Sequence, residues 1–235
     1  MRILIISVLT ATLLAGCAAA AEPSSDPSPA SAAPSQAAVP ADPNEALLLA
    51  LQNGDAKAVA DSFARGADPN AEVGPDVTPL QVALRRDDPV LVQLVVDAGA
   101  DVNALGLDAY TPLHRAAELN GGEIVTMLLA AGADPNVFTT DGRDYSPLHL
   151  AAAKHNLEAI EALVAGGVPI NGHNPELDAT ALHYAAFVGD TEVIQLLLNL
   201  GADPQALQLD GYTALEVAQA NGQDAAAAML ELVTG

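Results

Sequence analysis

Histidine is the side chain in this sequence best suited to chemistry near neutral pH, because it can act as a base or bind a metal ion. Three of the five histidines, His114, His149 and His183, close a recurring tetrapeptide and follow Thr-Pro-Leu, Ser-Pro-Leu and Thr-Ala-Leu respectively. A catalytic or metal site combines different side chains at one place, whereas these histidines return at intervals of 35 and 34 residues. We therefore interpret them as structural residues of a repeated element.

The remaining histidines, His155 and His173, fall at expected turns. A zinc site formed by them would need carboxylate partners, for instance Glu176 or Asp178. An acid–base pair of carboxylates would need a dry, concave pocket that shifts one pKa, and no nucleophile–base spacing stands out. The sequence therefore predicts no metal site, no cofactor and no enzymatic activity.

The charge balance constrains the partners. The 235 residues contain 8 Lys and Arg against 30 Asp and Glu, a formal net charge of −22. Because nucleic acids and anionic membrane surfaces both attract Lys and Arg, the composition disfavours binding to either. After Lys154 there is no Lys or Arg, whereas 11 Asp and Glu follow. This pattern favours a protein partner with a basic surface, although acidity that serves solubility alone would look the same.

The amino-terminal residues have the pattern of a targeting segment. Arg2 precedes an apolar stretch that is too short to span a bilayer and that ends in Leu14-Ala15-Gly16-Cys17. This tetrapeptide resembles the lipobox of bacterial lipoproteins, which implies that residues 1–16 are a signal peptide and that Cys17 carries lipid. Ala18 in place of Asp favours the outer membrane over the inner one. The alternative is an ordinary secretory signal.

Residues 17–43 are expected to be the lipidated Cys17 and a disordered tether. Residues 18–43 contain 10 Ala, 6 Pro and 5 Ser and no aromatic residue. Such a segment cannot bury enough apolar surface to fold. We expect it to hold a folded domain, residues 44–235, at a distance from a membrane on its periplasmic side.

Two motifs recur in phase through residues 44–235. Copies or variants of Gly-Ala-Asp-Pro-Asn begin at Gly66, Gly99, Gly132, Gly167 and Gly201, and the Thr-Pro-Leu series begins at Thr78, Thr111, Ser146, Thr180 and Thr213, with spacings of 33 to 35 residues in both series. Thr or Ser before Pro is typical of a helix N-cap, and Thr78 with Gln81 and Thr213 with Glu216 have capping-box spacing. The glycines stand where a left-handed residue ends a helix. We predict two helices per repeat around a core of Ala, Leu and Val.

These motifs resemble the ankyrin repeat. The resemblance covers six units at about 44–76, 77–109, 110–144, 145–178, 179–211 and 212–235. It implies an all-α repeat solenoid in which helix-turn-helix units are joined by β-hairpins or turns, and in which the motif histidine is a buried hydrogen-bonding residue. We expect a monomer.

The resemblance also implies that partners bind to hairpin tips and to the groove-facing ends of the first helices. Carried over by position, the expected partner-binding residues are Arg85, Arg86, Tyr110, Leu119, Phe138, Arg143, Tyr145, Lys154, Phe187, Val188 and Tyr212. The hairpins also place Leu105, Leu207 and Leu209 on this surface. Aromatic side chains are typical of binding hot spots, but the tyrosines could instead pack beside the next hairpin.

The sequence thus predicts a non-enzymatic, membrane-anchored periplasmic module that binds an envelope protein. Similarity to bacterial ankyrin proteins suggests support of an oxidative-stress enzyme. The alternatives are an immunity protein that neutralises a toxic effector enzyme and a passive envelope scaffold. The fold leaves the identity of the partner open.

Overall fold

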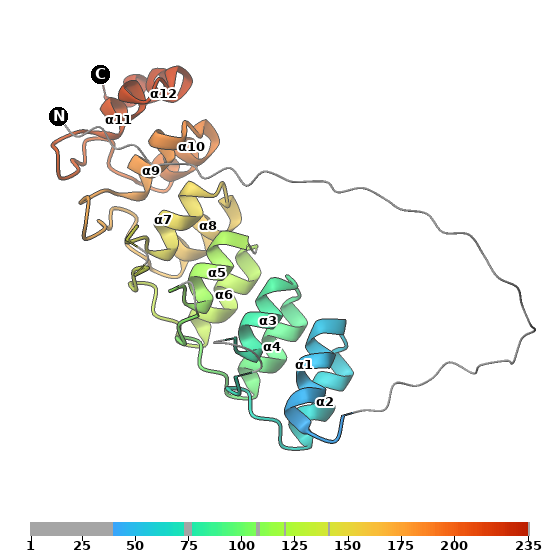
Figure 1. The fold of residues 1–235 in the computed structure, drawn as a ribbon. Helices are drawn as coiled ribbons and strands as arrows, with labels where there is room; N and C mark the ends of the chain where they lie inside the picture. Colours follow the sequence, from blue (N-terminus) through green and yellow to red (C-terminus); the bar gives the residue numbers. More distant parts are fainter. Residues whose placement is uncertain (1–39, 73–76, 107–108, 120, 141, 235) are drawn as a thin grey trace, which may run out of the picture. The chain divides into compact units, whose positions relative to one another are not determined.

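A computed structural model of the protein describes residues 40–72, 77–106, 109–119, 121–140 and 142–234. Within these ranges the chain forms twelve α-helices and no β-strand (Figure 1). The helices are α1 Pro43–Asn53, α2 Ala56–Ala64, α3 Pro79–Arg85, α4 Pro89–Asp97, α5 Pro112–Leu119, α6 Gly122–Ala130, α7 Pro147–Ala153, α8 Leu157–Ala165, α9 Ala181–Val188, α10 Thr191–Asn199, α11 Ala214–Ala220 and α12 Asp224–Thr234. The expected signal peptide, Cys17 and most of the expected tether lie outside the described residues.

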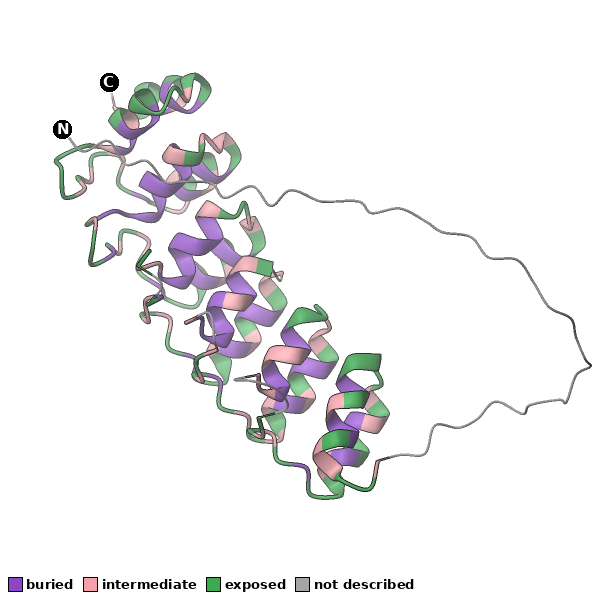
Figure 2. Ribbon diagram, viewed as in Figure 1, coloured by how far each residue is buried: buried purple, intermediate pink, exposed green. Residues whose placement is uncertain are grey.

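The helices stack in two layers, which we call the inner layer (the odd-numbered helices) and the outer layer (the even-numbered helices). The odd-numbered helices pack against one another in chain order from α1 to α11, and the even-numbered helices do the same from α2 to α12. The two helices of each repeat also pack together, and Figure 2 shows buried positions in every successive pair. One apolar cluster of Ala, Leu, Val and Ile runs from Leu47 to Leu230 between the layers. The expected all-α repeat solenoid is confirmed.

The inner helices begin where the sequence places their N-caps. The Thr78 hydroxyl accepts the N–H of Gln81, and the Gln81 side chain accepts the N–H of Thr78 at 3.0 Å. Thr213 and Glu216 form the same capping box, with 2.8 Å between the Thr213 nitrogen and Oε2 of Glu216. Backbone bonds close turns in the described parts of the connecting segments, such as the bond from Gln208 N–H to the Tyr212 carbonyl (3.0 Å).

Asparagines join the turns of successive repeats. Oδ1 of Asn103 accepts the backbone N–H of Asp134 at 2.8 Å, and its amide donates to the Gly132 carbonyl at 3.2 Å. Equivalent bonds from Asp68, Asp101 and Asp203 reach Asn44, Asn70 and Asn171. One step of this ladder is interrupted, because Pro169 occupies the Asp position and proline has no N–H to donate.

None of the described helices is both long enough and apolar enough to cross a membrane.

Candidate protein-interaction surface

The three motif histidines tie each repeat to the next one. Nδ1 of His149 accepts the backbone N–H of the N-cap residue Ser146 at 3.3 Å, and His114 and His183 do the same with their own N-caps. Nε2 donates to carbonyls of the following repeat, which are those of Tyr145 for His114 (2.9 Å), Ala179 for His149 (3.0 Å) and Tyr212 for His183 (3.1 Å). Because a carbonyl can only accept, the neutral ring carries its proton on Nε2.

Burial keeps the rings of His149 and His183 neutral. Desolvation lowers the pKa of His149 to about 4 from an ordinary value of 6.5, and it lowers the pKa of His183 as well. Both ring nitrogens are engaged in hydrogen bonds, so neither is available to a substrate or a metal ion. The structural interpretation of the motif histidines is confirmed.

The other two histidines lie at the surface. Nδ1 of His155 is 2.5 Å from Oδ2 of Asp190 in the next repeat, and this hydrogen bond raises the pKa of His155. His173 lies 3.1 Å from the carboxylate of Asp178 in its own turn. Among the residues that the structure describes, no three His, Cys, Asp or Glu side chains are grouped so that they could hold a metal ion.

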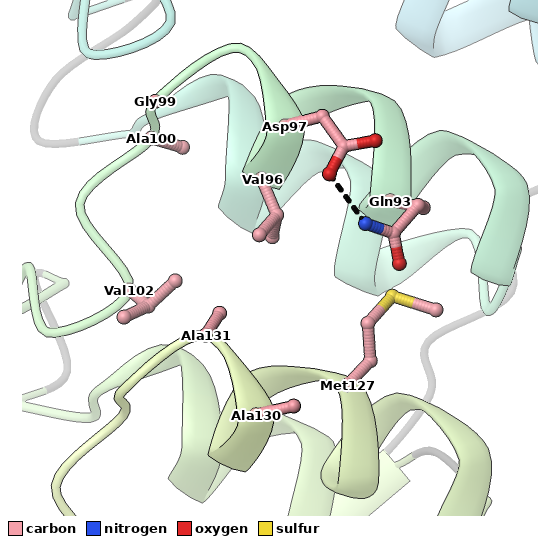
Figure 3. Close-up of a pocket in the computed structure, with 9 residues that line it drawn as sticks. All are labelled: Gln93, Val96, Asp97, Gly99, Ala100, Val102, Met127, Ala130 and Ala131. Atoms are coloured by element: carbon pink, nitrogen blue, oxygen red, sulfur yellow. Dashed lines mark hydrogen bonds between the residues drawn. The ribbon is translucent and has the colours of Figure 1, made fainter.

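An open groove lies between the outer helices α4 and α6, with a volume of about 530 Å³. Figure 3 shows Val96 and Val102 on one side and Met127 and Ala131 on the other, and Gln93 donates to Asp97 at the rim (2.6 Å). None of the expected partner-binding residues lines this groove. Nothing in its lining is arranged for acid–base chemistry, because its one carboxylate is exposed.

The expected helix-end residues are mostly exposed. Leu119 ends α5 and Val188 ends α9 at equivalent positions, and their exposed fractions are 52% and 49%. Phe187 instead packs partly against the core. It therefore offers less surface to a partner than the sequence suggests.

The charged helix-end residues are exposed but already make contacts. Arg85 and Arg86 lie at the end of α3, and the guanidinium of Arg86 donates to the carbonyl of Gln52 in the preceding repeat. The ammonium group of Lys154 lies 3.1 Å from the carboxylate of Glu118. These contacts cross between repeats, so the side chains stabilise the stack as well as lining its surface.

Two of the three hairpin tyrosines follow the packing alternative. Tyr110 is 8% exposed, and its ring lies beside His114. The guanidinium carbon of Arg115 lies over this ring, 5.1 Å from the ring centre. The ring of Tyr145 meets that of Tyr184 edge-on at 4.9 Å. Tyr110 is expected from its sequence position at the partner-binding surface, but its ring is buried against its own repeat and leaves little area for a partner to contact.

The other hairpin residues differ in exposure. Arg143 is exposed, Phe138 is half-buried, and Tyr212 is 50% exposed. Leu207 and Leu209 are exposed beside Tyr212. In the sequence, this exposed apolar tip is recognisable as two leucines, Leu207 and Leu209, that stand a few residues before Tyr212.

Comparison with known proteins gives a consistent assignment. A family model described as ankyrin repeats (3 copies) matches residues 47–139 and 148–233. The crystal structure of EF0377, an ankyrin repeat protein, is similar with a TM-score of 0.69 and 25% identity, and the match covers 80% of this chain and 97% of that one. The ankyrin repeat domain of Bcl-3, a unique member of the IkappaB protein family, matches with a TM-score of 0.69 and 26% identity over 81% of this chain and 86% of its own.

Proposed function

The chain belongs to the ankyrin repeat family, and we propose that it is a non-enzymatic module that binds a protein of the bacterial cell envelope. Ankyrin repeat proteins are generally protein–protein interaction modules. The observation that carries the proposal is the pair Leu119 and Val188, which stand half-exposed at equivalent ends of α5 and α9. Large apolar side chains that recur on one face are typical of a surface that a partner covers.

The anchor is the second part of the proposal. The Leu14-Ala15-Gly16-Cys17 sequence supports lipidation of Cys17 and cleavage before it. Two or three acyl chains on one residue suffice for stable anchoring, whereas one chain holds only marginally. Ala18 in place of Asp favours the outer membrane, and the Ala/Pro/Ser-rich segment would hold the repeats away from it on the periplasmic side.

The partner is a protein with a basic surface. Every Lys and Arg of the repeat domain lies at or before Lys154, and 11 acidic residues follow it. Such a surface steers a cationic partner and repels acidic ones, and salt weakens the effect.

The proposal is tested by photocrosslinking in living cells. A photoreactive amino acid at Val188 is expected to capture one envelope protein. The matched control is Val90, which is also exposed but lies on the outer helix α4. Capture of the same proteins from both positions would show that crosslinking at Val188 is not specific. Capture of no protein from Val188 would contradict a binding site at the ends of α5 and α9.

Deletion strains separate the possible roles. Support of an oxidative-stress enzyme predicts sensitivity to peroxide. Immunity against a toxic effector predicts harm only beside toxin-delivering sibling cells. A passive scaffold predicts neither phenotype.

A further inference from the structure

Apolar side chains gather at the tips of the hairpins that precede α9 and α11. Leu207, Leu209 and Tyr212 are 53%, 70% and 50% exposed, and Leu177 is half-buried beside them. The N–H of Leu209 donates to the carbonyl of Leu177 at 2.8 Å, so the two tips lie side by side. We call Leu177, Leu207, Leu209 and Tyr212 the tip patch.

The backbone under the tip patch is held in place. The carbonyl of Tyr212 accepts from Nε2 of the buried His183 at 3.1 Å and from the N–H of Gln208 at 3.0 Å. Gly211 turns the tip with a φ of 78°, which favours glycine. A partner that covers the patch therefore does not have to order this part of the chain first, and preorganisation of this kind favours affinity.

Acidic side chains flank the patch residues in the chain. Glu176, Asp178 and Asp210 are all exposed and lie next to patch residues in the chain. Asp178 interacts with His173, whereas no described Lys or Arg lies within ion-pair distance of Glu176 or Asp210. The equivalent tip of the second repeat differs, because its exposed Leu105 lies in the part of the chain that contains the lysines and arginines.

We propose that the tip patch binds a segment of a partner protein in which large apolar side chains are flanked by Lys or Arg. This rests on the proposed function and locates its binding site. The apolar side chains of the segment cover Leu207, Leu209 and Tyr212, and its cations neutralise Glu176 and Asp210. A second copy of this chain would bring like charges together, so the charge argues against self-association.

The probe is a short fluorescent peptide in which leucines are flanked by lysines, titrated into the full chain in an uncharged detergent. Fluorescence anisotropy gives the Kd, with detergent alone as the blank. Leu207→Ser with Leu209→Ser is expected to raise the Kd about tenfold or more, because hot-spot side chains dominate binding. These side chains are exposed, so the fold is expected to survive, and circular dichroism checks it.

Two matched controls make the result specific. Leu105→Ser removes an equally exposed leucine (56%) at the same hairpin position of the second repeat, and it is expected to leave the Kd unchanged. Glu176→Gln with Asp210→Asn is expected to weaken binding several-fold and to reduce its salt dependence. Glu161→Gln, on the exposed side of α8, is the charge control and is expected to have no effect.

Other outcomes overturn the proposal. Equal losses from Leu105→Ser and the Leu207→Ser/Leu209→Ser variant would show non-specific apolar binding. Undiminished affinity when the peptide lysines are replaced by glutamates would remove the charge argument. A dimer of the unmodified chain that Leu209→Ser dissociates would identify a second copy as the occupant. A negative peptide result alongside a specific crosslink from Val188 would reject the tip patch and leave the proposed function standing.

Discussion

At the scale of the residue, the motif histidine performs two tasks that other residues perform separately. Gln81 and Glu216 stand at the same helix position and complete a capping box. His149 completes its capping box with Nδ1 and uses Nε2 to hold the Ala179 carbonyl of the next repeat. Nδ1 can accept the Ser146 N–H only while the ring is neutral, and the buried ring is not solvated as a cation, so the stability of the stack is linked to pH.

This linkage predicts the effect of acid on stability. The folded-state pKa of His149 is lowered to about 4 from 6.5, so the unfolded chain binds the proton at higher pH. The contribution of His149 to the free energy of unfolding is therefore complete above pH 6.5. This contribution falls by about 3 kcal/mol as the pH falls toward 4. In His149→Gln the new side chain can still complete the capping box, as Gln81 does in α3. This variant is therefore expected to show a smaller loss of stability between pH 6.5 and 4.

Urea unfolding followed by circular dichroism across this pH range measures the difference. His155→Gln is the control with the opposite sign. Because Asp190 raises the pKa of His155, the stability that this pair adds is present at low pH and is lost as the pH rises through the raised pKa. Identical pH curves for the wild type and His149→Gln would contradict the linkage.

The tyrosines mark where prediction from sequence stops. Tyr110, Tyr145 and Tyr212 all precede the Thr-Pro-Leu position, so their local sequence gives them one shared expectation. Tyr145 is half-buried against Tyr184 of the next repeat, whereas Tyr212 is 50% exposed. Tyr110 is covered by His114 and Arg115 of its own repeat, and Tyr145 by a ring about one repeat away, so exposure depends on neighbours that the shared motif position does not encode.

At the scale of the element, small residues set how closely the outer helices approach. A Cβ on Gly122 would lie 2.7 Å from the carbonyl oxygen of Glu158, and a Cβ on Gly166 would lie 2.5 Å from Cδ1 of Leu129. Both glycines lie where α6 meets α8. Ala131 follows α6 as Gly166 follows α8, and it lines the groove between α4 and α6 (Figure 3).

Gly122→Ala is therefore expected to lower the free energy of unfolding by about 1 to 3 kcal/mol, although alanine is the better helix former. The clash is with a backbone atom that cannot move aside independently. The matched control is Gly121→Ala, whose Cβ would meet the flexible carboxylate of Glu158 at 2.6 Å. It is expected to cost less than about 1 kcal/mol. Equal losses in chemical denaturation would refute the close-packing explanation.

The interrupted asparagine ladder gives a second prediction for the elements. Asn103→Ala removes bonds to Asp134 and Gly132 and is expected to cost about 1 to 2 kcal/mol. Asn136→Ala is expected to cost less than half as much, because the residue it would face, Pro169, has no N–H. Thermal or urea unfolding of the two variants provides the comparison, and a larger loss from Asn136→Ala would show that the ladder is not interrupted there.

At the scale of the whole molecule, the repeated features were predictable and the features that break the repetition were not. The repeat period, the helix caps and the composition of the core follow from residues that recur five times. A single degraded copy, such as the one that begins at Gly167, therefore does not change the predicted fold. The candidate surface depends instead on single departures, such as Phe187 turning partly into the core and Leu209 meeting Leu177. These are long-range contacts, and a single sequence does not specify them.

The proposed anchor gives the last prediction. With a net charge of −22 the chain is repelled by an anionic membrane surface, so the attachment that we propose has to come from acyl chains, which contribute about 0.8 kcal/mol for each buried CH₂. Cells fed an alkyne-tagged fatty acid are expected to label the wild type and not Cys17→Ser. High salt is expected to leave the wild type in the membrane fraction, because no electrostatic attraction is being screened.

Ala18→Asp keeps the acylated cysteine and is expected to move the labelled protein to the inner membrane. A wild-type chain that is cleaved and secreted without label would establish an ordinary secretory signal, and the repeats would then act free in the periplasm.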